Sequence, residues 1–506
     1  MRIGRNKTEP QSAGHKNERR QVELVEWLYY SLSALGGIVV ILIAVVLIRT
    51  LRFKPRKENE VGAQEISFDR ERVIENLRLA VKCRTVSDYS RENEDEEEFA
   101  KLLSLLPERY PAVYRECTLI KFPDRGLLYR WRGKDSSSPT VLMAHYDVVP
   151  TLDEQWKKPP FEGIVEDGVL WGRGTLDTKV TFCSTLFAVD SLIERGFVPK
   201  QDVYLAFSGC EEVNGKGAVN IVEWFKENKI EPAMVLDEGG AVVENVFPGV
   251  ARPCAFIGIA EKGLLDLEYE VTSSGGHSSA PKPHTPVGIL SRACVNIEAK
   301  PFKMHLTPPV RQMFDTLGRH SSFLYRMIFA NLWLFKGILN SICKKSGGEL
   351  NALVRTTVAF TQMKGSTTSN VIPPRATMVS NLRLNPCDTM DSATEYIKSC
   401  IGDGQVKINT LRGMDPSRIS RTDTEGYESL VRSIKETWGG TLVSPYLMVQ
   451  CSDSRHWGCI SDKVYRFSAM DLTAEERSTI HGHNERIRLD CLMRAQEFYL
   501  RLIERL

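Results

Sequence analysis

The longest apolar run of the chain extends from Trp27 to Ile48 and contains no charged side chain. At about 1.5 Å per residue, a helix of this length spans the roughly 30 Å hydrocarbon core of a bilayer. Aromatic residues cluster at its N-terminal end, where amphipathic rings prefer the membrane interface. Basic residues, rather than a small-residue cleavage site, follow the run. The pattern therefore predicts a retained transmembrane helix over 27–48, preceded by a polar tail over 1–26.

A basic and polar linker, 49–65, follows the predicted membrane helix. Its first half carries more basic residues than the segment just before the helix, namely Arg49, Arg52, Lys54, Arg56 and Lys57. The positive-inside rule then places the large domain of a single-pass protein in the cytoplasm. Further basic residues in the N-terminal tail reduce the difference in positive charge between the two flanks of the helix.

Beyond the linker, short apolar runs alternate with helical patterns. Residues 140–144, 203–207 and 233–236 are typical of buried strands, and helical stretches are predicted over 180–195 and 218–226. Strands that alternate with helices predict a mixed, mostly parallel sheet flanked by helices. The fold class expected for the main part of the chain is therefore α/β.

After Gly263, apolar and polar residues alternate strictly, as in a sheet with one solvent-exposed face. Residues 265–271 alternate in this way, and 355–363 and 376–384 resemble further strands of the same unit. We therefore expect an α+β domain inserted into the catalytic fold. The predicted segments are a catalytic part over 66–262, the inserted lid or dimerisation domain over 263–410, and a second catalytic part over 411–506.

A second apolar helical stretch lies within the expected inserted domain, over 323–343. Its only charged residues before the end are Arg326 and Lys336. One interpretation is a helix buried in the domain core or in a subunit interface. The other is an apolar cover for an acyl chain, which could also dip into the bilayer beside the anchor. Both interpretations stay open at this point.

Composition narrows the classes of function. The 42% apolar content over 506 residues is sufficient for more than one packed core. The 66 Lys and Arg nearly balance 64 Asp and Glu, so nucleic acid is not expected as a partner. The 12 cysteines show no C-x-x-C pair and are typical of buried thiols. The acidic run 92–98 is interpreted as the solvated start of a helix.

Residues that can bind a metal follow each of the three predicted buried strands. These residues are His145 and Asp147, Glu211 and Glu212, and Asp237 and Glu238. Ligand sites in open α/β sheets form at the carboxyl ends of strands. Any one of the three clusters could be an ordinary surface loop, but their shared position indicates one site.

Two further candidates lie outside these strands. Asp177 opens a predicted helix, where it could serve as an N-cap. Near the end of the chain, His481 and His483 stand in the sequence H-G-H-N-E. A mixture of imidazole and carboxylate ligands suits zinc, whereas an all-oxygen set suits calcium or magnesium. Two metal ions about 3.5–4 Å apart require a shared carboxylate and can hold both a water and a substrate oxygen.

Together these stretches resemble the zinc-dependent aminoacylase, acetylornithine deacetylase and carboxypeptidase S family. Within it, the likeness is nearest to carboxypeptidase S and the N-fatty-acyl-amino-acid hydrolases. The resemblance covers most of the chain after the linker, in the family's order. It is carried by residues 143–150, 156–179, 211–212, 237–240, 275–281, 370–374 and 481–485.

The resemblance implies a site with two Zn²⁺, with another divalent metal as an open alternative. His145, Asp177 and Asp237 would hold one ion. Asp177, Glu212 and His481 would hold the other, so that Asp177 bridges the two. The family motif places the ligand first in H-G-H, which selects the earlier of the two histidines.

Other roles follow from the same resemblance. Asp147 would orient His145 and raise its basicity. Glu211 would be the general base that takes a proton from the attacking water and passes it to the leaving amine. His277, in the inserted domain, would stabilise the oxyanion, often from a partner subunit. The resemblance thus also implies a homodimer formed through the inserted domain.

The predicted substrate carries a free carboxylate. Asn370 and Arg383 resemble the residues that hold this group, and a guanidinium can donate two parallel hydrogen bonds to it. Asp453 and Arg455 resemble a further substrate loop. The expected reaction is amide hydrolysis in small peptides or N-acyl amino acids. The alternatives are an inactive binding or scaffold protein of the same fold, and a co-catalytic zinc aminopeptidase, which needs a free amine.

Overall fold

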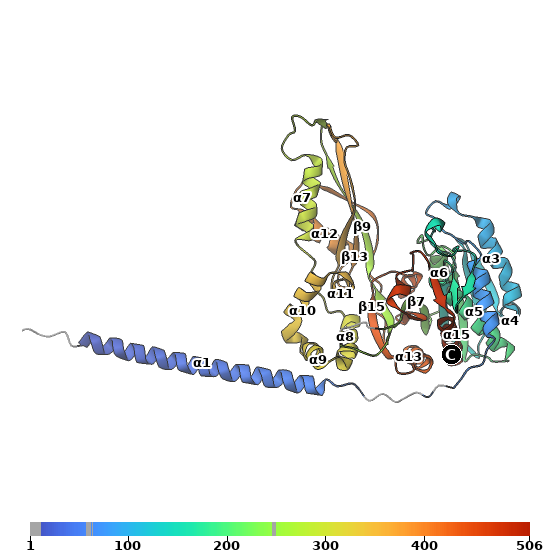
Figure 1. Ribbon diagram of the computed structural model, residues 1–506, viewed down its shortest axis with the longest axis horizontal. Coiled ribbons are helices and arrows are strands. Elements are labelled where there is room, and N and C mark those ends of the chain that lie inside the picture. The colour runs from blue at the N-terminus through green and yellow to red at the C-terminus, as the bar shows by residue number, and fades with distance from the viewer. Residues whose placement is uncertain (1–11, 57–61, 63, 245–248) are drawn as a thin grey trace, which may run out of the picture.

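The computed structural model describes residues 12–56, 62, 64–244 and 249–506. Its longest element is helix α1 (Ser12–Arg52), which projects from the rest of the molecule (Figure 1). The helix includes the part of the predicted polar tail that follows residue 11; the first residues of that tail lie outside the described ones. Within α1, Leu24–Arg52 is long and apolar enough to be a membrane span or a signal sequence.

An eight-stranded mixed sheet forms the centre of the main body. Its strands, in spatial order, are β1 (Thr118–Phe122), β2 (Gly126–Trp131), β6 (Gln201–Ser208), β3 (Asp135–His145), β7 (Met234–Val243), β16 (Val464–Leu472), β8 (Cys254–Glu261) and β15 (Leu442–Met448). Strands β6, β3, β7 and β16 run parallel, and β1 and β2 form an antiparallel edge. The predicted α/β class, with a mixed sheet flanked by helices, is confirmed.

Helices cover both faces of this sheet because its central strands are apolar on both sides. In β3, Leu142 and Ala144 face the larger core, whereas Val141 and Met143 face a second cluster around α6 (Gly217–Glu227). The larger core contains α2 (Arg70–Val81), α3 (Glu96–Arg109), α4 (Pro111–Glu116), α5 (Lys179–Glu194), α13 (Glu425–Thr437) and α15 (Leu489–Ile503). The predicted acidic run supplies the first turn of α3.

The inserted domain has a separate sheet and core. Its antiparallel strands, in spatial order, are β11 (Thr357–Lys364), β13 (Arg375–Leu384), β9 (Gly263–Thr272) and β14 (Lys407–Met414). Helices α7 (Pro286–Glu298) and α12 (Met390–Ile401) pack against them. The alternating residues of β9 point into this core. The boundary predicted at residue 410 falls inside β14, so the domain extends farther than expected.

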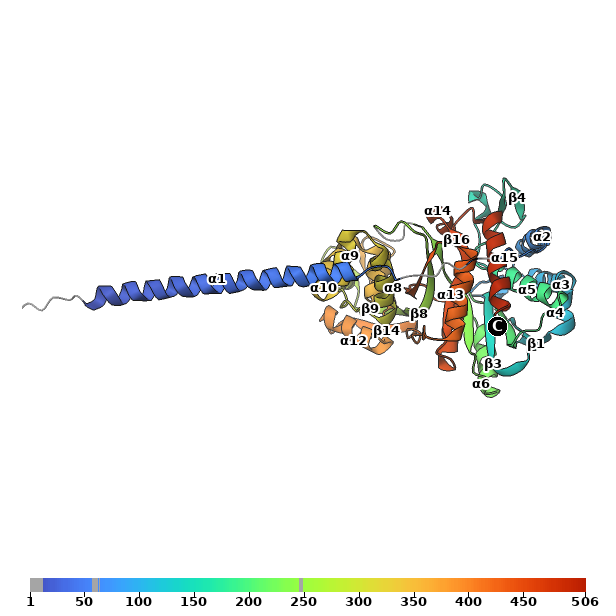
Figure 2. The same cartoon turned by 90° about the horizontal axis from the view of Figure 1, so that it is seen from below.

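A helical segment between the strands of the inserted domain packs elsewhere. It consists of α8 (Pro308–His320), α9 (Phe323–Ala330), α10 (Leu332–Ser346) and α11 (Gly348–Val354). Its buried apolar residues join the core of the main body, and α8 lies against β15. The segment is therefore a bridge between the two domains, seen beside the base of α1 in Figures 1 and 2.

Short elements complete the described structure. Strands β4 (Ile164–Glu166), β5 (Val169–Trp171) and β17 (Arg486–Arg488) form a small sheet that joins segments far apart in sequence. β10 (Gly276–His277) pairs with β12 (Val371–Ile372) at the edge of the inserted domain, and α14 (Ala474–Arg477) follows β16. All 12 cysteines lie among the described residues and have free thiols.

Candidate metal and active site

The three predicted clusters lie together in the main sheet, two of them at the carboxyl ends of strands and the third within a strand. His145 is the last residue of β3, and Glu211 and Glu212 follow the end of β6. Asp237 and Glu238 lie within β7, on the other side of β3. The spatial order β6–β3–β7 therefore brings the three clusters together.

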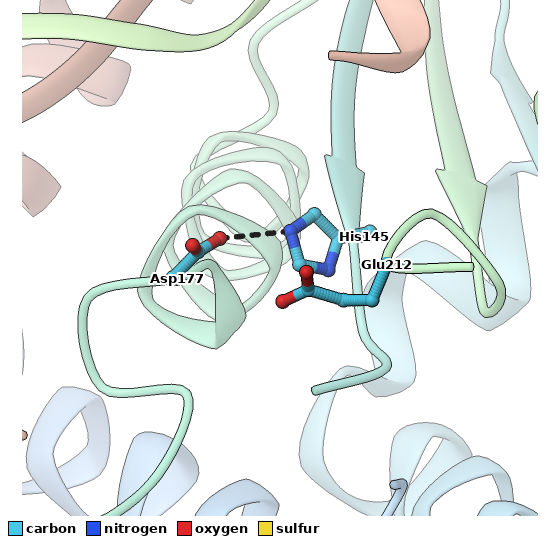
Figure 3. Close-up of side chains that lie close together, drawn as sticks. All are labelled: His145, Asp177 and Glu212. Carbon is cyan, nitrogen blue, oxygen red and sulfur yellow. Dashed lines mark hydrogen bonds and ion pairs between the residues drawn. The ribbon is translucent and has the colours of Figure 1, made fainter. Parts of the chain in front are cut away.

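Asp177 lies between two histidines that come from opposite ends of the sequence. One of its carboxylate oxygens is 2.9 Å from His145 Nε2, and the other is 3.0 Å from His481 Nε2. His481 Nε2 is also 3.1 Å from Glu212 Oε2. Figure 3 shows the side chains of His145, Asp177 and Glu212 converging on one point. Asp177 is thus not an N-cap; it offers one oxygen to each side of the cluster.

The fifth side chain that faces the cluster is Glu238, the neighbour of the predicted ligand Asp237, whose role as a ligand stays a prediction. Glu238 Oε1 lies 3.3 Å from His145 Nε2. Both oxygens of Asp237 instead accept backbone hydrogen bonds, from the N–H of Ser454 and of Glu238, each at 2.9 Å. Asp237 is buried, and its carboxylate oxygens bind backbone N–H groups. It therefore positions this strand end rather than facing the imidazole.

Asp147 holds the loop that carries both glutamates. Its carboxylate accepts hydrogen bonds from the backbone N–H of Glu211 and of Glu212, each at 3.1 Å, and from Ser87 Oγ at 2.7 Å. One of its oxygens is also 3.4 Å from His145 Nδ1. A single buried carboxylate therefore fixes the imidazole and two acidic side chains relative to one another.

The site concentrates negative charge in a buried place. Burial raises the pKa of Glu211 well above its usual value and that of Glu238 to about 8. Burial opposes the charge of Asp177 too, but hydrogen bonds from both histidines lower its pKa. Hydrogen bonds to Asp177 and Glu212 raise the pKa of His481 to about 10. Acidic groups outnumber the imidazoles, so the pocket favours a cation.

The donor set fits a divalent metal. The ligand atoms of His145, Asp177 and Glu212 lie within 4.8 Å of one another, and so do those of His145, Glu211 and Glu238. Glu212 Oε1 is buried without a hydrogen-bond partner among the described residues. A buried polar atom without a partner is costly, and a bound cation would satisfy it.

Sequence reasoning missed the role of Glu485, which connects the segment 173–177 to the C-terminal segment that carries His481. The buried carboxylate of Glu485 accepts hydrogen bonds from the N–H of Leu176 at 2.7 Å and of Asp177 at 3.2 Å. Its other oxygen accepts from the N–H of Gly174 and from Arg173 Nη1. The glutamate in H-G-H-N-E was the available signal, but its partners lie more than 300 residues away in the sequence.

Three further predicted residues, His277, Asn370 and Arg383, belong to the inserted domain. His277 is exposed on β10, where its Nδ1 is 2.8 Å from Ser279 Oγ, and Asn370 is exposed nearby. Arg383 Nη1 donates to Cys451 Sγ at 3.4 Å. Only the last of these three side chains approaches the site within the single chain, since Cys451 lines the site's cavity.

The predicted substrate loop runs beside the cluster. Asp453 is buried, and neither of its carboxylate oxygens has a hydrogen-bond partner among the described residues. Burial raises its pKa to about 7. Arg455 donates to Asn214 Oδ1 at 2.8 Å, which connects this loop to the one that follows Glu212. The loop therefore borders the acidic cluster, as expected for a substrate-contacting segment.

A cavity of about 490 Å³ opens onto the acidic cluster. Its charged and imidazole lining residues include Asp177, Glu211, Glu212, Glu238 and His481. Its apolar lining residues, here called the apolar wall, are Leu176, Ala241, Val243, Phe256, Tyr446, Met448, Met470, Leu472 and Ile480. The site thus combines a charged centre with a wall suited to an aliphatic group.

Comparison with known proteins identifies the family. A family model described as peptidase family M20/M25/M40 matches residues 141–505. The chain belongs to the M20 peptidase family. An N-fatty-acyl-amino acid synthase/hydrolase of Xenopus tropicalis is 37% identical, over 92% of this M20 chain and 93% of that protein. A probable carboxypeptidase S-like protein of Dictyostelium discoideum is 34% identical, over 85% of this chain and 84% of that protein.

Solved structures share the fold. An M20 family metallo-carboxypeptidase from Sulfolobus solfataricus matches with a TM-score of 0.61 and 19% identity, over 85% of this chain and 98% of that one. Human carnosine dipeptidase 1 matches with a TM-score of 0.58 and 15% identity, over 86% and 96%. The predicted family resemblance is confirmed, and this M20 chain is an enzyme of the metallopeptidase and amidohydrolase class.

Proposed function

We propose that this M20 enzyme is anchored to a membrane by α1 and hydrolyses the amide bond of N-acyl amino acids, with two divalent metal ions at the acidic cluster. The observation that carries the proposal is the position of Asp177. Its two oxygens face two imidazoles, each of which also faces a different glutamate. This is the arrangement that a bridging carboxylate between two metal ions requires.

In this proposal His145, Asp177 and Glu238 hold one ion, and Asp177, Glu212 and His481 hold the other. Glu238 takes the place expected for Asp237 because it is the carboxylate that faces the imidazole. The mixed imidazole and carboxylate set favours zinc. When bound, such ions lower the pKa of a water and polarise the substrate carbonyl.

Glu211 is the proposed proton carrier. Its carboxylate lies beside the cluster, and burial raises its pKa, so it holds a proton more readily than an exposed glutamate. It takes a proton from the water whose oxygen bonds to the carbonyl carbon. When the C–N bond breaks, it gives that proton to the leaving amine nitrogen, which restores the carboxylate.

The apolar wall of the cavity supports an acyl group as one half of the substrate. Several of its side chains, such as Phe256, Met448 and Ile480, line the same cavity as the acidic cluster. For the other half, Arg383 is the proposed partner of the free carboxylate, with Asn370 beside it when a second copy closes the site. His277 would then stabilise the oxyanion from that second copy, since it is exposed in the single chain.

A Glu211→Gln variant tests the proton carrier. It should keep its metal content but lose roughly 10²–10⁴-fold in kcat, because the amide cannot accept the proton. Glu349→Gln is a matched control, since Glu349 lines the same cavity but lies outside both metal groups. Full activity in the Glu211 variant would refute the assignment.

A series of N-acyl derivatives of one amino acid, from acetyl to long chains, tests the substrate class. Each CH₂ that enters the apolar wall contributes about 0.8 kcal/mol, or roughly fourfold in kcat/KM. We expect kcat/KM to rise over the series until the wall is filled. A flat series, or higher rates with dipeptides, would contradict the acyl-binding role of the wall.

A further inference from the structure

The helix pair α9–α10 exposes an apolar face. Its exposed apolar side chains are Phe323, Leu324, Trp333, Leu334, Ile338 and Ile342. On α10, Leu334, Ile338 and Ile342 recur every four residues and so form one stripe. Leu339 and Cys343, on the other side of the helix, are buried in the main core. The pair is therefore apolar on two sides, and the described protein covers only one of them.

This face does not reach the active-site cavity. The described residues that line the cavity include Glu349 of α11 but none from 323–343. The structure thus favours neither a helix buried in the domain core nor a direct cover for the acyl chain. A subunit interface and a lipid bilayer are the two candidate partners for the exposed stripe.

Helix α1 is fixed to the same pair. Arg49 Nη2 donates to Ala330 O at 3.0 Å, and Asn331 Nδ2 donates to Val46 O at 3.3 Å. Asn331 Nδ2 also donates to Thr50 Oγ1. Figures 1 and 2 show α9 and α10 beside the C-terminal end of α1. These contacts join the pair to the last turns of the candidate membrane span. In the proposed anchoring, the ends of the span lie at the depth of the lipid headgroups.

The charge of the segment matches a lipid surface. Between Asp315 and Glu349 the sequence contains no acidic residue, whereas it contains Arg319, Arg326, Lys336, Lys344 and Lys345. The three lysines are exposed. Basic residues beside an apolar face of Trp, Phe and Leu are typical of helices that lie in the membrane interface. A second copy would bring the same positive charge against this face, which disfavours a dimer there.

We infer that α9–α10 is a second membrane contact, inserted into the headgroup region beside α1. The inference rests on the proposed anchoring by α1 and extends it from a tether to a fixed orientation. Helix α11 follows α10 through Gly347 and carries Glu349 to the wall of the cavity. The substrate class that this geometry serves is an amphiphile that partitions into the bilayer.

Tryptophan quenching by brominated lipids tests the inference on the full chain. The protein is placed in nanodiscs of phosphatidylcholine with a minority of phosphatidylglycerol, with and without bromine near the headgroup end of the acyl chains. Trp333→Phe should remove part of the quenched emission. Trp27→Phe, at the N-terminal end of the span, should remove a comparable part. Trp224→Phe, in α6 of the main body, should leave the quenched fraction unchanged.

The variants separate the possible failures. If Trp27 is quenched but Trp333 is not, the second contact is refuted while the anchor stands. If neither is quenched, the anchor and the second contact are both refuted, and hydrolysis measured in detergent still tests the proposed reaction. Cross-linked dimers that map to α9–α10 in the nanodiscs would also overturn the inference.

A paired substitution gives a functional readout. Trp333→Glu with Ile338→Glu places charge on an exposed face, so folding should be retained. We expect kcat/KM to fall at least several-fold for a long-chain substrate supplied in vesicles and to stay unchanged for a soluble acetyl substrate. Leu411→Glu, on the exposed strand β14, is the matched control. Equal rates on the vesicle substrate would contradict the inference.

Discussion

Replacing Glu485 by glutamine should damage the metal site although Glu485 is not a proposed ligand. Its carboxylate is fully buried and accepts hydrogen bonds from the N–H of Leu176, of Asp177 and of Gly174, and from Arg173. The amide of glutamine keeps one acceptor oxygen. Its NH₂ group then faces donors, and the buried guanidinium loses its counter-charge.

The magnitude follows from the burial of both partners. Side-chain exposures of 3% for Arg173 and 0% for Glu485 define a buried ion pair with a 2.7 Å separation. Removing one partner of such a pair costs about 3–5 kcal/mol. Arg173 keeps a hydrogen bond to Gly482 O and its position over the Trp156 ring, so we expect the lower end, about 3 kcal/mol. With an unfolding entropy of about 2.1 cal/mol/K per residue over the roughly 440 residues after the linker, a change of this size lowers Tm by about 3 °C.

Displacement of Asp177 should also weaken metal binding. Partners that orient metal ligands typically contribute about 10–100-fold to metal affinity or activity. The assay is zinc reactivation of chelator-treated enzyme, in parallel with thermal unfolding in detergent. Glu475→Gln is the control, because Glu475 is 79% exposed and pairs with Arg486 on the same segment. Unchanged Tm and an unchanged reactivation midpoint in the Glu485 variant would refute the reasoning.

Two further predictions address the ligand set and acid stability. Glu238→Ala should lose at least one equivalent of bound metal, measured by elemental analysis, because Glu238 faces His145. Asp237→Asn should retain its metal, because both oxygens of Asp237 accept backbone hydrogen bonds; the opposite result would favour Asp237 as the ligand. Burial, and then the charge of Arg455, lower the pKa of His456 to about 4, below its value near 6.5 in the unfolded chain. The unfolded chain therefore binds more protons between these values, so this stability is present above about pH 6.5 and is lost, on the order of 2 kcal/mol, as the pH falls towards 4. His456→Gln should flatten that part of the Tm profile, and an unaltered profile would contradict the assignment.

The sequence predicted the location of the site but not which side chain of a pair would face it. The three strand-end clusters could be found because apolar runs mark buried strands and parallel strands end at one edge. Adjacent residues of a strand alternate between faces, so Asp237 and Glu238 cannot both face His145 by the same geometry. The register of β7 with β16 shifts between Asp237 and Gly240. That shift re-aims the side chains, and it depends on a strand more than 200 residues away.

Packing partners were likewise beyond the sequence pattern. The helical spacing over 323–343 predicted helices, which α9 and α10 confirm, but apolar residues were present on two sides of α10. The periodicity of apolar residues does not indicate which side of α10 packs against the rest of the protein. The expected boundary at 410 lies within β14, because the alternation of β14 is weak and its place in the sheet comes from pairing with β9.

The order of the strands along the sequence decides when each strand can join the main sheet during synthesis. β16 lies in the middle of the main sheet, between β7 and β8, yet it is translated after every other strand of that sheet. Helix α15, which packs along α5, follows it, and the carbonyl of Leu506 accepts a hydrogen bond from the N–H of Lys200. The inserted sheet has a separate core, so it can fold before the central strand β16 of the main sheet has been synthesised. A premature stop before β16 therefore leaves unpaired strand edges inside the sheet and a substrate for chaperones, rather than a slightly shortened enzyme.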